Sequence, residues 1–88
     1  NNPYRLRILG RMVKDMLLSM AGSGESVEIK KISGKDETRG HLASMGFIEG
    51  EKITVVSEMA GGLILDIKGT RIAIDRGMAN RIVCEGVA

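Results

Sequence analysis

The stretch Arg39-Gly40-His41-Leu42-Ala43-Ser44-Met45-Gly46-Phe47-Ile48-Glu49-Gly50 carries the clearest structural signals in this chain of 88 residues. Leu42 and Met45 are three residues apart and share one face of a helix. Gly46 stands where a helix ends in the left-handed region, and Phe47 would pack back on Leu42, as in a Schellman ending. The stretch therefore predicts a short helix that a glycine terminates. Gly50 follows in a second turn.

Apolar residues alternate with polar ones on both sides of this stretch and predict short strands. We expect strands over residues 26–32, 52–58, 63–67, 71–74 and 81–85. The helix between the first two spans 38–45, with Asp36 as its N-cap. Glycine in the turn Ala60-Gly61-Gly62 is expected to supply a positive φ, and Asp75 is expected to cap one helical turn that ends at Ala79.

The N-terminal residues differ from the rest of the chain. Met12, Met16 and Met20 recur at helical spacing, which predicts a short helix over 12–20 whose methionines pack on the core. Residues 1–11 hold three arginines and no acid. We interpret them as a tail, either native or a remnant of cloning, and expect their deletion to leave the fold unchanged.

These elements predict a mainly β fold: a small barrel of about five strands, with one short helix between the first two and a short N-terminal helix. Residues 12–88 would form this single domain. The core is expected from the apolar members of the strands and the helix, namely Val27, Ile29, Leu42, Ile53, Val55, Leu65, Ile67 and Ile82.

Chemistry-bearing motifs are absent from the sequence, which favours a protein that is not an enzyme and holds no cofactor or metal. His41 is the only histidine and reads as a surface helix residue, while Cys84 reads as a small buried hydrophobe. Residues 12–88 contain 10 basic and 11 acidic residues and one aromatic, so they lack the basic face and stacking platform of a nucleic-acid binder. No apolar run is long enough to insert into a membrane.

The order of residues over 18–85 resembles the FeoA family. Gly24-Glu25 precedes the first strand, and Gly62-Leu63-Ile64-Leu65 and Gly69-Thr70-Arg71-Ile72-Ala73-Ile74 follow at the family's spacing. The central block is similar to the family signature Leu-x-x-Leu-Gly-[apolar]-x-x-Gly, with Met45 at the second leucine position. The matching motif residues are Leu42, Met45, Gly46, Phe47 and Gly50.

This resemblance implies an SH3-like barrel and a small cytoplasmic accessory protein of bacterial ferrous iron uptake. Its partner would be FeoB, the GTP-driven membrane iron transporter, contacted from the cytosolic side. Three alternatives stay open: a direct ferrous iron binder with transition-metal affinity, a regulator that modulates the GTPase, and a free-standing peptide-binding domain akin to the C-terminal domain of DtxR-type repressors. Fold alone does not choose between them.

Candidate partner contacts are apolar residues that the strand pattern leaves outside the core. Ile48 follows the helix end, and Met59 precedes the hairpin turn at residues 60–62. Arg39 and His41 would supply a polar rim. The alternative is that both apolar residues are ordinary surface positions, which are common in soluble proteins.

Overall fold

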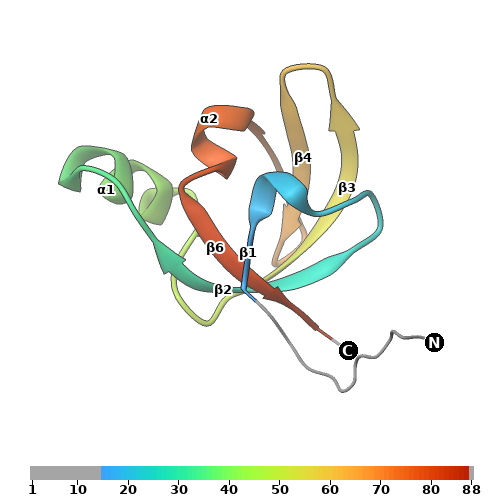
Figure 1. Ribbon diagram of the computed structural model, residues 1–88, viewed down its shortest axis with the longest axis horizontal. Coiled ribbons are helices and arrows are strands. Elements are labelled where there is room, and N and C mark those ends of the chain that lie inside the picture. Colours follow the sequence, from blue (N-terminus) through green and yellow to red (C-terminus); the bar gives the residue numbers. More distant parts are fainter. Residues whose placement is uncertain (1–14, 88) are drawn as a thin grey trace.

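The computed structural model describes residues 15–87, which form an antiparallel sheet of six strands with short helices between them (Figure 1). The strand order is β1-β6-β2-β3-β4-β5. The elements are β1 (Met16–Leu17), the 3₁₀ helix η2 (Leu18–Met20), β2 (Ser26–Ile32), α1 (Asp36–Ser44), β3 (Lys52–Met59), β4 (Gly62–Ile67), β5 (Thr70–Asp75), α2 (Arg76–Ala79) and β6 (Ile82–Gly86).

The five expected strands are all present, with no bound shifted by more than one residue. The expected N-terminal helix is wrong over its described part, because Met16–Leu17 form a sixth strand and only residues 18–20 are helical. Its first residues, 12–14, lie outside the described chain. β1 pairs with the edge of β6, Met16 opposite Cys84, so tertiary pairing overrides the helical spacing. Met16 is half-buried against the core whereas Met20 is 70% exposed.

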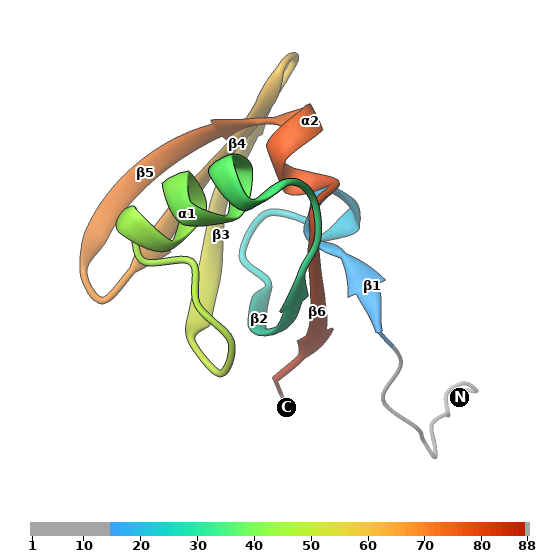
Figure 2. The same ribbon diagram turned by 90° about the vertical axis from the view of Figure 1, so that its left-hand side faces the viewer.

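The sheet curls around one core without closing through strand pairing. β1 and β5 are its two edges among the described residues, so the expected small barrel is present as a curled sheet whose two edge strands do not pair with each other. Figure 2 shows the curl, with β5 at the outer margin of the sheet and β6 running below α2 beside β2. All eight expected core residues are buried, and the core further includes Leu18, Ala21, Phe47, Leu63, Ile74, Ala79 and Cys84.

Helix α1 ends as its glycine predicts. Gly46 has φ +103°, the Phe47 N–H donates to the Leu42 carbonyl at 3.0 Å, and the Gly46 N–H donates to the Ala43 carbonyl at 3.0 Å. These are the two hydrogen bonds of a Schellman motif. The helix start differs from expectation, because Lys35 occupies the N-cap position without a side-chain hydrogen bond. Asp36 lies inside the first turn, where the helix dipole favours an acid.

The β3–β4 hairpin needs glycine for a reason other than the one expected. Neither Gly61 nor Gly62 is among the residues with positive φ. Gly62 is buried opposite Asp75 of β5, and a Cβ there would lie 2.1 Å from the Ile74 carbonyl oxygen. Close approach of the β5 backbone, not turn geometry, therefore excludes a side chain at this position.

Helix α2 connects β5 to β6. The Met78 N–H donates to the Asp75 carboxylate at 2.8 Å, which confirms the predicted cap. The Arg76 guanidinium donates to the Ser19 carbonyl at 3.3 Å and to the Met59 carbonyl at 3.2 Å. One side chain thus ties η2, α2 and the hairpin together.

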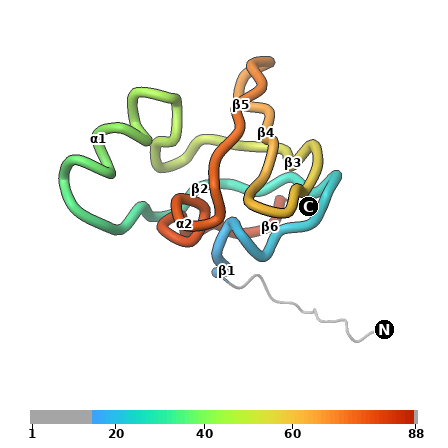
Figure 3. The backbone as a smooth tube through the Cα atoms, turned by 90° about the horizontal axis from the view of Figure 1, so that it is seen from above, coloured from blue at the N-terminus to red at the C-terminus, as the bar shows by residue number. Residues whose placement is uncertain are grey.

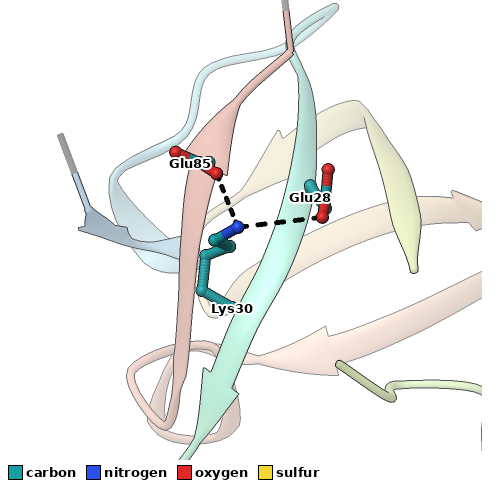
Figure 4. A network of polar contacts seen from close by, with 3 residues as sticks. All are labelled: Glu28, Lys30 and Glu85. Atoms are coloured by element: carbon teal, nitrogen blue, oxygen red, sulfur yellow. Dashed lines mark ion pairs between the residues drawn. The ribbon is translucent and has the colours of Figure 1, made fainter. Parts of the chain in front are cut away.

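A small charge cluster fastens β2 to β6 on the outside of the sheet. Glu28 and Glu85 are direct cross-strand partners, so their negative charges repel each other. A register irregularity between Ile29 and Lys31 places Lys30 between the two acids, 2.7 Å from Glu85 and 3.8 Å from Glu28 (Figure 4). The hydrogen bond to Glu85 and both negative charges raise the pKa of Lys30.

Candidate functional site

A groove of about 290 Å³ lies between α1, the loop that follows it and the end of β2. It is lined by Ile32, Arg39, Ala43, Phe47, Ile48 and Glu49. Figures 1 and 3 show α1 standing away from the sheet on the side opposite the β3–β4 hairpin, so the groove occupies one end of the molecule.

The Schellman ending of α1 sets the direction of the side chains that follow it. Phe47 returns to the core and is fully buried beneath the groove, whereas Ile48, the next residue, remains 48% exposed. Gly50 has φ +89°, and its N–H donates to the Ile29 carbonyl at 2.8 Å. The Ile29 N–H in turn donates to the Glu51 carbonyl at 2.9 Å. The loop is therefore pinned to β2, and Ile48 is presented on a fixed backbone.

Two charged side chains, those of Arg39 and Glu49, line the groove together with its apolar residues. The Arg39 guanidinium contacts the Asp36 carboxylate at 3.1 Å, one turn earlier in α1. The pair is exposed and contributes little stability, so the guanidinium stays available to a partner. Glu49 is exposed and has no ion pair within residues 15–87. The lining of the groove thus combines apolar side chains with two charges of opposite sign.

Only part of the expected contact set meets at this groove. Arg39 and Ile48 line it together. His41 is exposed on α1 but does not line the groove. Met59 is 44% exposed at the end of β3, beside the hairpin on the opposite side of the molecule. Met45 of the family motif is half-buried and packs against the core.

Three groove residues, Ile32, Ala43 and Glu49, were not expected from the sequence. Ala43 follows Arg39 by four residues, so helical spacing alone places both on one face. Ile32 ends β2, and only the path of the chain around α1 brings it beside Ile48. Strand periodicity carries no information about that meeting.

Three other properties of residues 15–87 concern metal binding, membrane crossing and thiol chemistry. No three His, Cys, Asp or Glu side chains converge there in a way that would hold a metal ion. No helix in that range has the length and apolar character needed to cross a bilayer. Cys84 is fully buried, as predicted, and burial raises its pKa to about 11, with smaller contributions from Glu25 and Asp15.

Comparison with known proteins gives consistent matches in sequence and structure. The family model described as the FeoA domain matches residues 16–86. A relative from Methanocaldococcus jannaschii, described as a putative Fe(2+) transport protein A, is 40% identical over 68 residues, which cover 77% of this chain and 83% of the relative. A crystal structure described as an iron uptake regulatory protein (FeoA) is 32% identical, with a TM-score of 0.79 over 84% of this chain and 99% of that one.

The fold also occurs within a larger protein. The crystal structure of IdeR from T. acidophilum is 22% identical, with a TM-score of 0.77 over 88% of this chain and 36% of that one. At this identity the likeness concerns the fold alone. Together the structural matches confirm the expected mainly β, SH3-like architecture.

Proposed function

The chain belongs to the FeoA family, and we propose that it is an accessory protein of ferrous iron transport that binds the cytosolic part of FeoB through the α1 groove. The names of its relatives, an Fe(2+) transport protein A and an iron uptake regulatory protein, supply the transport context. The observation that carries the choice of surface is Ile48, exposed beside Arg39 on a rigid loop.

Ile48 has the properties of an interface anchor. Its side chain does not belong to the buried core, so the fold does not need it. The loop that carries Ile48 is already held by backbone hydrogen bonds to β2, so its ordering on binding would cost little conformational entropy. Apolar anchors surrounded by polar groups are the usual centre of protein interfaces.

The charges beside Ile48 would set the orientation of the partner. Arg39 and Glu49 both line the groove, so a complementary segment would bring an acid toward Arg39 and a base toward Glu49. Such exposed pairs govern the rate and salt dependence of binding more than its final affinity. We therefore expect binding to FeoB to weaken as ionic strength rises.

The experiment compares Ile48→Ser with Met59→Ser, two exposed apolar residues at opposite ends of the molecule. Both variants should melt close to wild type, because neither residue is in the core. Loss of a buried isoleucine contact costs about 1.5–3 kcal/mol, or roughly ten- to a hundredfold in affinity for the cytosolic part of FeoB.

Weakened binding by Ile48→Ser, with Met59→Ser unchanged, supports the groove. The reverse result would move the contact to the hairpin end, where Met59 lies. If both folded variants bind FeoB like wild type, the proposed surface is wrong. Failure of wild-type protein to bind FeoB at all would contradict the proposed partner itself.

A further inference from the structure

Strand β5 has one unpaired edge among the described residues. It is the last strand of the sheet and pairs only with β4, through six positions from Gly62↔Asp75 to Ile67↔Thr70 (Figure 2). Unlike β1, which has two residues, β5 has six, and it is long enough to template another strand. None of the residues that line the α1 groove belongs to it.

The register shows which backbone groups face outward. Ile67 and Thr70 flank the two-residue turn at residues 68–69 and so form a hydrogen-bonded pair. Pairs of this kind recur at every second residue, so the N–H and C=O groups of Ile72 and Ile74 point toward β4. Those of Arg71 and Ala73, and the N–H of Asp75, therefore point away from the sheet.

The side chains of these outward-facing residues form a self-complementary pattern. Arg71, Ala73 and Asp75 are exposed, whereas Ile74 is buried and Ile72 half-buried on the other face. An antiparallel strand with the same sequence, centred on Ala73, would place Arg71 opposite Asp75 at both ends. No ion pair within residues 15–87 occupies either residue.

We propose that β5 is a homodimer edge, on which a second copy of this chain pairs antiparallel about a two-fold axis through Ala73. The two Ala73 residues exchange N–H···O=C hydrogen bonds, and the Asp75 N–H of each copy donates to the Arg71 carbonyl of the other. Arg71 of each copy meets Asp75 of the other on the outer face. Ile72 and Ile74 then face each other across the pair and extend the apolar inner face.

A symmetric contact of this kind is closed, so it yields dimers and not filaments. It joins two strand edges and buries little area, which places it in the weak, concentration-dependent class. The pairing is independent of the α1 groove, and both surfaces can be occupied in one assembly.

The first test is a cross-link. Ala73→Cys places two thiols across the two-fold axis at about 5.5 Å between Cα atoms, within the range of a disulfide. Native Cys84 is buried and will not compete. The matched control is Thr70→Cys, an exposed residue outside the proposed pairing of residues 71–75, because two residues at position 70 would lie about 20 Å apart along the paired strands. Mild oxidation should therefore give a disulfide dimer for Ala73→Cys only.

The second test is sedimentation of the full chain from about 10 μM to about 1 mM at low salt. Wild type should shift from monomer to dimer, and the shift should weaken at about 500 mM salt. Ala73→Pro removes an N–H that faces away from β4, so it should melt near wild type yet stay monomeric. Arg71→Glu would place two acids opposite each other at both ends of the paired strands, so this variant should also stay monomeric.

Wild type that remains monomeric up to the highest concentration overturns the proposal. So does equal cross-linking of the two cysteine variants, because that result indicates random collision. A dimer that survives Ala73→Pro would locate the interface elsewhere on the molecule.

Discussion

Replacement of Gly62 by alanine tests the closest backbone approach in the fold. The added Cβ would lie 2.1 Å from the Ile74 carbonyl oxygen, 2.9 Å from the Asp75 Cα and 3.0 Å from the Ile74 carbonyl carbon. All three atoms belong to the β5 backbone and cannot rotate away. β4 and β5 must therefore separate by roughly 1 Å or more at this point before ordinary contact distances are reached.

The cost follows from what holds the two strands there. The Arg76 N–H donates to the Gly61 carbonyl at 3.0 Å, and the Arg76 guanidinium holds the Met59 carbonyl, so the hairpin is tied to α2 close to Gly62. Overpacking costs about 1–3 kcal/mol, and each weakened backbone hydrogen bond adds about 0.5–1.5 kcal/mol. We expect Gly62→Ala to lower the free energy of unfolding by about 3 kcal/mol, or roughly 12–24 °C in Tm.

The assay is urea and thermal unfolding followed by far-ultraviolet circular dichroism, since the chain has no tryptophan. Gly61→Ala is the matched control, because a Cβ added at Gly61 would meet no atom within 4 Å and its φ is not positive. It should stay within about 0.5 kcal/mol of wild type. If Gly62→Ala is equally mild, with an unchanged m value, the close approach of β5 is not a constraint and the reasoning fails.

Four further predictions concern other parts of the molecule. Gly46→Val should lower the free energy of unfolding by about 1–3 kcal/mol because valine is strained at φ +103°. Gly40→Ala in the same helix should raise it by about 1 kcal/mol. A Gly46→Val melting temperature within a degree or two of wild type would contradict the assigned helix ending. Burial raises the pKa of the Cys84 thiol to about 11, so as pH rises from 9 to 11 the unfolded chain loses the thiol proton before the folded chain does. The free energy of unfolding should therefore fall in that pH window, and it should fall less in Cys84→Ala. Lys30→Gln should destabilise the fold because it leaves the like charges of Glu28 and Glu85 opposite each other, and added salt should reduce this effect. Lys31→Gln, at an exposed position, is the control. Equal melting temperatures of the two variants at low salt would refute the stabilising role of Lys30. Calorimetric titration with Fe²⁺ should show no tight stoichiometric binding to the isolated protein, and such binding would replace the proposed role with that of an iron carrier.

The sequence was informative where a local rule has a single structural outcome. Gly46 and Phe47 predicted both hydrogen bonds of the α1 ending, since few residues other than glycine adopt a left-handed cap. Asp75 predicted the α2 cap through its position alone. Alternation located the five longer strands and seven of the buried strand residues, because side chains in a strand face opposite sides in turn.

Tertiary structure decided the features that depend on distant partners. Met16 has helical spacing with Met20, yet it pairs with Cys84 because β6 offers an open edge. Gly62 is required by the backbone of β5, which comes later in the chain, and no turn rule contains that information. Arg39 and Ile48 meet in one groove while Met59 lies elsewhere, because the path of α1 and its loop, fixed by long-range hydrogen bonds to β2, determines which exposed residues become neighbours.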